Sequence, residues 1–135
     1  MKLIVCVDDN GGMLFNKRRI SRDRVLCQHI IKMAKGANLW VNAYSRDLFS
    51  ETDCNIPLYC GENHCIAKED YLFAEDLAVE KLLPLADTLI LYRWNRRYPS
   101  DVKFPLELLG QWKLVSACDF PGSSHEKITC EVYCK

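Results

Sequence analysis

Acidic side chains at two places in the chain have the chemistry to bind a ligand. Asp8 and Asp9 directly follow an apolar run, Leu3 to Val7, that has the character of a buried strand. Ligands of open α/β sheets bind where such strands end, although acids are also common in polar turns. Asp23 lies at the start of an amphipathic segment, where an acid stabilises the positive end of a helix. Beside an active-site strand, the same carboxylate can bind a protonated ring nitrogen.

Two basic stretches are candidates for binding phosphate. The first is a cluster of cations that consists of Lys17, Arg18, Arg19, Arg22 and Arg24. The second, residues 93–98, interleaves arginines with a tryptophan and a tyrosine, which can stack on nucleic-acid bases. The whole chain has 18 basic and 18 acidic residues, so its formal net charge is zero. This balance is atypical of a non-specific nucleic-acid binder, and nucleic acid is therefore not the partner we expect.

Several familiar catalytic motifs do not occur in the sequence. It contains no P-loop and no G-x-G-x-x-G, and its 3 histidines are far apart. The segment Ser123-Ser124-His125 is not part of a G-x-S-x-G nucleophile elbow, so the sequence does not support acyl transfer. The loop at residues 60–65 offers Cys60, His64 and Cys65, which is fewer protein ligands than a structural zinc site uses. We therefore expect no metal site.

The 8 cysteines predict thiols rather than disulfides. The first residues have the pattern of a buried strand and not of a signal peptide, which favours a cytoplasmic location and reduced cysteines. Cys6, Cys27 and Cys118 lie in apolar runs and are predicted to be buried. No apolar run approaches the ~20 residues of a membrane helix, so we expect no membrane partner.

The elements that must position these side chains follow from the apolar pattern. Strands are predicted at residues 3–7, 37–41, 56–60, 71–73, 88–94, 112–118 and 127–133. Helices are predicted at 22–35, with Ser21 as the N-cap, at 75–83, and over a short stretch at 44–50. The near-continuous apolar character of 3–7, 37–41, 71–73 and 88–91 predicts that they lie near the centre of a sheet covered on both faces. The chain is thus predicted to be one domain, 1–135, with a three-layer α/β fold: a mostly parallel twisted sheet, helices on both faces and an antiparallel C-terminal edge.

The order and spacing of motifs along nearly the whole chain resemble dihydrofolate reductase. Residues 1–7 followed by Asp-Asp-Asn-Gly-Gly-Met are similar to that family's first strand and the mobile loop after it. Residues 18–23, Arg-Arg-Ile-Ser-Arg-Asp, stand where the family has W-x-L-P-x-D or E. Residues 71–89 resemble the family's strand, glycine pair, helix and following strand, and Ser-Asp-Val-Lys-Phe-Pro at 100–105 resembles its G-D-x-x-F-P. Residues 112–116 and 128–133 resemble the family's antiparallel end.

This resemblance implies roles for particular residues. It places Asp23 on the family's pterin-binding acid, which makes Asp23 the candidate catalytic residue. The tryptophan and proline near that acid are replaced by Arg18 and Ser21. A ligand cleft is implied around Val5, Asp8, Asp23 and Tyr92.

The cofactor positions depart from the family's pattern. The glycine pair, whose backbone approaches the nicotinamide, is replaced by Ala74 and Glu75. A Cβ at Ala74 would crowd the ring, and the carboxylate of Glu75 would repel a diphosphate. The phosphate segment G-R-x-T/S reads Asn-Ala-Tyr-Ser at 42–45 and keeps only the hydroxyl of Ser45. We therefore expect Ser45, Ala74 and Glu75 to mark a degraded NADPH site, and we expect no cofactor.

These departures favour a dihydrofolate reductase-like protein that no longer reduces dihydrofolate. It would bind another small ligand, such as a heteroaromatic ring, or a partner in the former cleft. One alternative is a compact NADPH-dependent reductase of dihydrofolate or a related pterin, with Asp23 as the proton-relay acid. A second alternative is a nucleic-acid-interacting module that uses residues 17–24 and 93–98.

Overall fold

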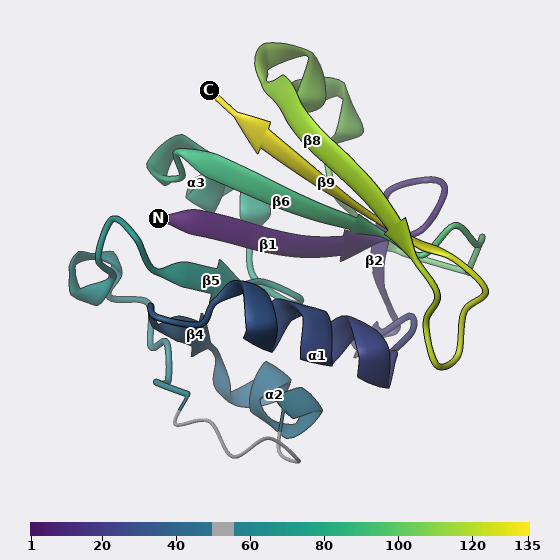
Figure 1. Cartoon of the computed structure of the whole chain (residues 1–135), viewed down its shortest axis with the longest axis horizontal. Helices are drawn as coiled ribbons and strands as arrows, with labels where there is room; N and C mark the ends of the chain where they lie inside the picture. Colours follow the sequence, from purple (N-terminus) through teal and green to yellow (C-terminus); the bar gives the residue numbers. More distant parts are fainter. Residues whose placement is uncertain (50–55) are drawn as a thin grey trace.

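A six-stranded twisted sheet forms the centre of the protein (Figure 1). The computed structural model describes residues 1–49 and 56–135. The strands lie in the order β4 (Leu39–Val41), β5 (Tyr71–Phe73), β1 (Lys2–Val7), β6 (Thr88–Arg93), β9 (Ile128–Cys134) and β8 (Lys113–Phe120). The first four are parallel, whereas β9 is antiparallel to both β6 and β8. This topology confirms the predicted mostly parallel sheet with an antiparallel C-terminal edge.

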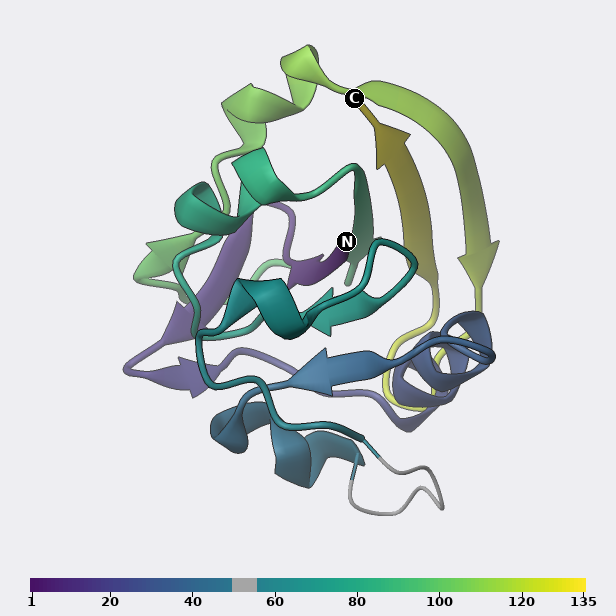
Figure 2. The same cartoon turned by 90° about the vertical axis from the view of Figure 1, so that its left-hand side faces the viewer.

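Helices cover both faces of the sheet, which gives the three predicted layers (Figure 2). Alternate residues of β1 point to opposite faces, as strand geometry requires. Leu3 and Val5 join the core covered by α3 (Val79–Leu82) and the 3₁₀ helix η3 (Leu83–Leu85). Ile4 joins the second core, beneath α1 (Arg24–Met33) and the 3₁₀ helix η1 (Asp47–Phe49), which follows α2 (Ala43–Arg46).

A second, three-stranded sheet was not predicted from the sequence. It has the order β3 (Arg18–Arg19), β2 (Gly12–Phe15) and β7 (Val102–Lys103), and it occupies a stretch that we expected to be a loop. Asn16 and Lys17 connect β2 to β3 with φ values of 52° and 64°. Two consecutive positive φ values suit a tight hairpin turn. This hairpin fixes the position of Arg19, which enters the candidate site.

Two predicted helices begin later than expected. The first begins at Arg24, because the N-cap is Asp23 and not Ser21: Asp23 has an extended backbone and its carboxylate accepts from the N–H groups of Val25 and Leu26. The helix predicted at 75–83 shortens to Val79–Leu82. The preceding residue, Ala78, has an extended backbone conformation, and residues 74–78 form a loop between β5 and α3.

The strand predictions need two corrections. Residues 56–60 do not form a strand; they contribute one parallel bridge, between Val41 and Leu58. The strand predicted at 37–41 forms as β4, which lies at one end of the strand order and not near the centre of the sheet. The short helix predicted at 44–50 is present as α2 and η1 as far as residue 49, and Ser50 lies outside the described residues. Two further 3₁₀ helices, η2 (Asn63–Cys65) and η4 (Leu106–Gln111), occupy loops.

The described cysteines are all free thiols, as predicted; Cys54 lies outside the described residues. Cys27 is buried, as predicted, whereas Cys6 is half-buried and not buried as predicted. The prediction that Cys118 is buried is wrong, because its strand β8 is the edge of the sheet and carries exposed side chains along most of its length. Among the described residues, the helices are all too short or too polar to cross a membrane.

Candidate functional site

The carboxylate of Asp23 is the most heavily hydrogen-bonded acid of the candidate site. Its Oδ1 accepts from the backbone N–H groups of Val25, Leu26 and Ser123, at 2.9, 3.1 and 3.0 Å. Its Oδ2 accepts from the N–H of Ser124 at 2.7 Å and lies 3.0 Å from Nδ1 of His125. The side chain of Asp23 is fully buried. Every accepting direction of this carboxylate is thus taken by the chain itself.

The loop between β8 and β9 supplies three of these partners. Figure 1 shows this loop reaching the N-terminal end of α1, where Asp23 lies. The N–H of Gly122 donates to the carbonyl of His125 at 3.0 Å, which closes the loop on itself. A Cβ on Gly122 would collide with Oδ2 of Asp23. The glycine is therefore required by the close approach of the loop to the acid.

His125 connects Asp23 to two hydroxyl groups. Its Nε2 lies 2.9 Å from Oγ of Ser21 and 2.9 Å from the phenolic oxygen of Tyr98, and these two oxygens are 3.2 Å apart. The indole of Trp94 stacks on the imidazole at 4.6 Å between ring centroids. The ring of His125 is buried and is held by contacts on its edges and on one face.

The charge of Asp23 determines how protons are arranged in this cluster. Burial alone would raise the pKa of Asp23, but the hydrogen bonds from His125, Ser124 and Ser123 lower it well below its usual range. The acid is therefore an ionised acceptor at neutral pH, and His125 must donate to it through Nδ1–H. In the neutral ring, Nε2 is then the acceptor for one of the two hydroxyl groups.

Asp8 holds Tyr98 in this cluster. Its Oδ1 accepts from the N–H groups of Asn10 and Gly12 at 2.9 and 2.7 Å, and its Oδ2 accepts from the N–H of Tyr98 at 2.9 Å. The acid that follows β1 is buried and joins the end of that strand to the segment after β6. Asp8 therefore acts on the site through the position of Tyr98.

A second buried acid, Glu75, closes the other side of the site. Arg19 donates to both of its carboxylate oxygens, from Nε at 2.8 Å and from a terminal nitrogen at 3.0 Å, and the hydroxyl of Ser45 donates at 2.7 Å. The guanidinium also stacks on the ring of Tyr44, 4.7 Å from its centroid. This bidentate pair neutralises the carboxylate that the sequence analysis expected to repel a diphosphate.

A narrow cleft is lined by residues from both the Asp23 cluster and the pair between Arg19 and Glu75. Its lining includes Ser21, Arg22, Asp23, Ala74, Glu75 and Trp94. The enclosed volume is about 20 Å³, which is room for about one water molecule. The cleft thus brings together three of the predicted site residues, Asp23, Ala74 and Glu75.

The other predicted site residues lie outside the cleft lining. Val5 is part of the apolar core, and Ser45 is buried behind Glu75. Asp8 binds backbone groups, as described above. Tyr92 is fully buried on the α1 face of the sheet, and its hydroxyl lies 2.7 Å from Nδ1 of His29.

Sequence reasoning missed Ser21, Tyr98, His125 and Arg19 as members of the site. Ser21 was interpreted as a helix cap, and acyl transfer was considered only for the serines next to His125. The hydroxyl that contacts the imidazole comes instead from a residue 104 positions away. The one local feature of the sequence that could have indicated this site is the segment Ser21-Arg22-Asp23, which places a hydroxyl, a cation and an acid side by side.

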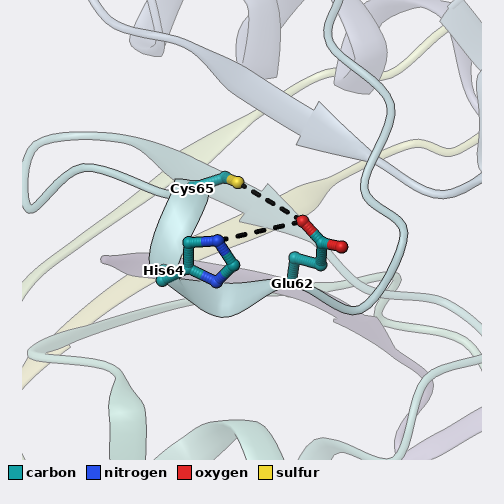
Figure 3. Close-up of side chains that lie close together, drawn as sticks. All are labelled: Glu62, His64 and Cys65. Atoms are coloured by element: carbon teal, nitrogen blue, oxygen red, sulfur yellow. Dashed lines mark hydrogen bonds and ion pairs between the residues drawn. The ribbon is translucent and has the colours of Figure 1, made fainter.

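The loop at residues 60–65 gathers possible metal ligands on the surface (Figure 3). Ligand atoms of Glu62, His64 and Cys65 all lie within 4.8 Å of one another, and all three residues are exposed. Cys60, which the sequence analysis grouped with His64 and Cys65, is not part of this group. The trio contains fewer protein ligands than a structural zinc site uses, so the absence of a metal site stays a prediction.

Comparison with known proteins identifies the fold. No protein-family model matches the sequence, and no curated protein matches it significantly. Among solved structures, the chain is similar to a dihydrofolate reductase from Enterococcus faecalis complexed with NADP(H) and RAB-propyl, with a TM-score of 0.69. The similarity covers 98% of this chain and 94% of that chain, at 12% sequence identity. The protein therefore has a dihydrofolate reductase-like fold, as its motifs predicted.

Proposed function

We propose that this protein does not reduce dihydrofolate and that its cleft serves a different small ligand. The observation that carries the proposal is the state of Asp23. An acid that binds a protonated pterin must present free carboxylate oxygens to the ring, whereas both oxygens of Asp23 are occupied by donors from α1 and from residues 123–125. Binding a pterin there would break several of these hydrogen bonds and leave their donors unpaired, which is costly in a buried site.

The cofactor side of the cleft supports the same proposal. NADPH needs close backbone approach at the positions of Ala74 and Glu75, where this chain has a Cβ and a buried carboxylate. Arg19 and Ser45 hold that carboxylate in place. The obstacle is therefore steric, since Arg19 removes the like-charge repulsion. The residues present do not fit a nicotinamide, and we assign the protein no NADPH chemistry.

The dimensions of the cleft restrict the ligand. An enclosed volume of about 20 Å³ excludes a fused heteroaromatic ring, so we expect the ligand to enter with a group about the size of one water molecule. The lining offers that group one hydroxyl, from Ser21, and one exposed guanidinium, from Arg22, among apolar side chains. These groups favour a small polar or anionic function, such as a carbonyl or a carboxylate.

Nucleic-acid binding has less support than it had from sequence. Two of the guanidinium groups on which that alternative depended are engaged: Arg19 by Glu75, and Arg93 by Glu131 at 2.6 Å. Lys17 and Arg18 remain exposed at the β2–β3 hairpin. A strongly salt-dependent shift with oligonucleotides would favour the alternative.

Two measurements test the proposal. Trp94 lines the cleft, so its fluorescence would report a cofactor bound there. Because we expect NADPH not to bind, titration with NADPH should leave the tryptophan fluorescence unchanged. Steady-state assays with NADPH and dihydrofolate should show no turnover above background, and Asp23→Asn should leave that background unchanged. Asp9→Asn is the matched control, because Asp9 is exposed. Turnover that falls in Asp23→Asn but not in Asp9→Asn would favour the compact reductase instead.

A further inference from the structure

We propose that Ser21, His125 and Asp23 form a nucleophilic triad that hydrolyses small acyl esters. The hydroxyl of Ser21 lies 2.9 Å from Nε2 of His125, and Nδ1 of the same ring lies 3.0 Å from Oδ2 of Asp23. These are the contacts by which a base takes the proton of a serine while an acid orients the base. The inference extends the proposed function by naming a reaction for the same cleft.

The burial of the three residues suits catalysis, because the serine that must reach the substrate is the most exposed of the three. Asp23 and His125 are buried, whereas Ser21 is half-buried; Ser21 and Asp23 both belong to the lining of the cleft. A purely structural cluster has no need to present its last hydroxyl to a cleft. The acid accepts four backbone N–H groups besides the imidazole, so the orientation of the ring is set before a ligand arrives.

Tyr98 and Arg22 complete the arrangement. The hydroxyl of Tyr98 lies 2.9 Å from Nε2 and 3.2 Å from Oγ of Ser21, next to the position of the reacting atoms. Arg22 belongs to the same cleft lining. We assign both groups to stabilising the negative charge that develops on the carbonyl oxygen, as an O–H donor and as a cation.

The reaction proceeds in two balanced steps. Oγ of Ser21 bonds to the carbonyl carbon, its proton passes to Nε2 of His125, and the carbonyl electron pair moves to oxygen. Collapse of this intermediate breaks the bond to the alcohol oxygen, which leaves with the proton from Nε2. Water then adds to the acyl-serine while Nε2 accepts its proton, and the second collapse releases the carboxylic acid and returns a proton to Oγ.

The cleft selects the acyl group. The enclosed space of about 20 Å³ beside Ser21 has room for a group the size of one water molecule, such as the methyl of an acetyl group, and the alcohol part of the ester must remain outside. Cys27 also lines the cleft, but burial raises its pKa to about 11, so at neutral pH it is a protonated thiol and a poor competing nucleophile. The substrate class is therefore short-chain acyl esters.

A small fluorophosphonate is the direct probe. It should form one covalent adduct on the wild-type protein, located at Ser21 by peptide mass spectrometry, and the protein should hydrolyse 4-nitrophenyl acetate. Ser21→Ala should lose both. Ser116→Ala is the control, because this serine is exposed on the edge strand β8 and is not part of the cleft lining. His125→Gln should slow labelling by about 10²-fold or more through loss of the base.

The role of Asp23 has its own readout. The rate of labelling should be measured against pH for the wild type and for Asp23→Asn; the titratable groups in contact with the imidazole of His125 in the described structure are Asp23 and Tyr98. Asp23→Asn should lower the rate of labelling and change its dependence on pH, which a merely structural role would not do in a folded variant. A folded wild-type protein with no adduct at Ser21 would overturn the triad. Turnover of NADPH would instead contradict the proposed function, so the two failures are distinguishable.

Discussion

The imidazole of His125 lies 3.0 Å from the carboxylate of Asp23, although the two residues are 102 positions apart in sequence. This contact joins the start of α1 to the loop between the two antiparallel strands. It also occupies the acid that the resemblance to dihydrofolate reductase assigns to pterin binding. Both proposals, the loss of pterin binding and the role of His125 as a base, therefore depend on this one contact.

Substitution of Gly122 should destabilise the protein through Asp23. A Cβ there collides with Oδ2 of the acid and stands 2.9 Å from Cδ1 of Ile128. We expect Gly122→Ala to lower the free energy of unfolding by about 1–3 kcal/mol, as overpacking does. Gly110→Ala is the matched control, since nothing lies within 4 Å of its added Cβ. Equal midpoints for the two variants in urea denaturation would contradict the packing described here.

Acid should remove the stabilisation that Asp23 provides. Its pKa is lowered in the folded state, so its contribution is fully present above the unfolded value near 3.8 and is lost as pH falls towards the folded value. Asp70, which accepts from the indole N–H of Trp40 at 3.0 Å, has a lowered pKa and therefore the same sign. The difference in stability between the wild type and Asp23→Asn should shrink below about pH 4. A stability difference between the two proteins that grows as pH falls would show that the pKa of Asp23 is not lowered in the folded state.

Breaking the pair between Arg19 and Glu75 should be costly because it leaves a largely buried carboxylate without its partner. Arg19→Met keeps the apolar stem and removes the charge, and it should cost about 1–3 kcal/mol of unfolding free energy. Arg18→Met, on an exposed neighbour, should have little effect. Thermal unfolding of both variants, with Glu75→Gln added to each, checks the prediction: the second substitution should recover stability only in the Arg19 variant.

Thiol reactivity should divide the cysteines by position. Burial raises the pKa of Cys27 and of Cys130 to about 11, so both should react slowly with a thiol reagent in the native protein. Cys60, Cys65 and Cys118 are exposed and should react first. All 8 thiols of the chain should be counted in denaturant without reductant. A lower count would indicate native disulfides.

The surface loop in Figure 3 should not retain stoichiometric zinc. The side chains of His64 and Glu62 are 79% and 68% exposed, so metal binding would have to order them without help from the surrounding structure. Elemental analysis after dialysis should find no metal beyond that of His64→Ala. About one zinc per chain in the wild type, absent from the variant, would establish a site here.

The sequence by itself predicted the architecture from local pattern. The apolar runs of β1, β5 and β6 are strands covered on both faces, and such runs need no partner to be recognised. The order of motifs also identified the fold and drew attention to Asp23, Ala74 and Glu75. Elements whose boundaries depend on distant partners were predicted less well: α1 begins after Asp23 and not Ser21, and the helix expected from residue 75 begins at Val79.

Only the tertiary structure decided what surrounds those residues. Asp23 is closed off by a loop that follows β8, Glu75 is neutralised by an arginine from a small hairpin, and Ser21 meets His125 across 104 positions. Hydrogen bonds and ion pairs of this kind depend on distances of about 3 Å, and a single sequence carries no measure of distance between remote segments. Exposure of Cys118 has the same origin, because strand order, and not the apolar character of the strand, places β8 at the edge of the sheet.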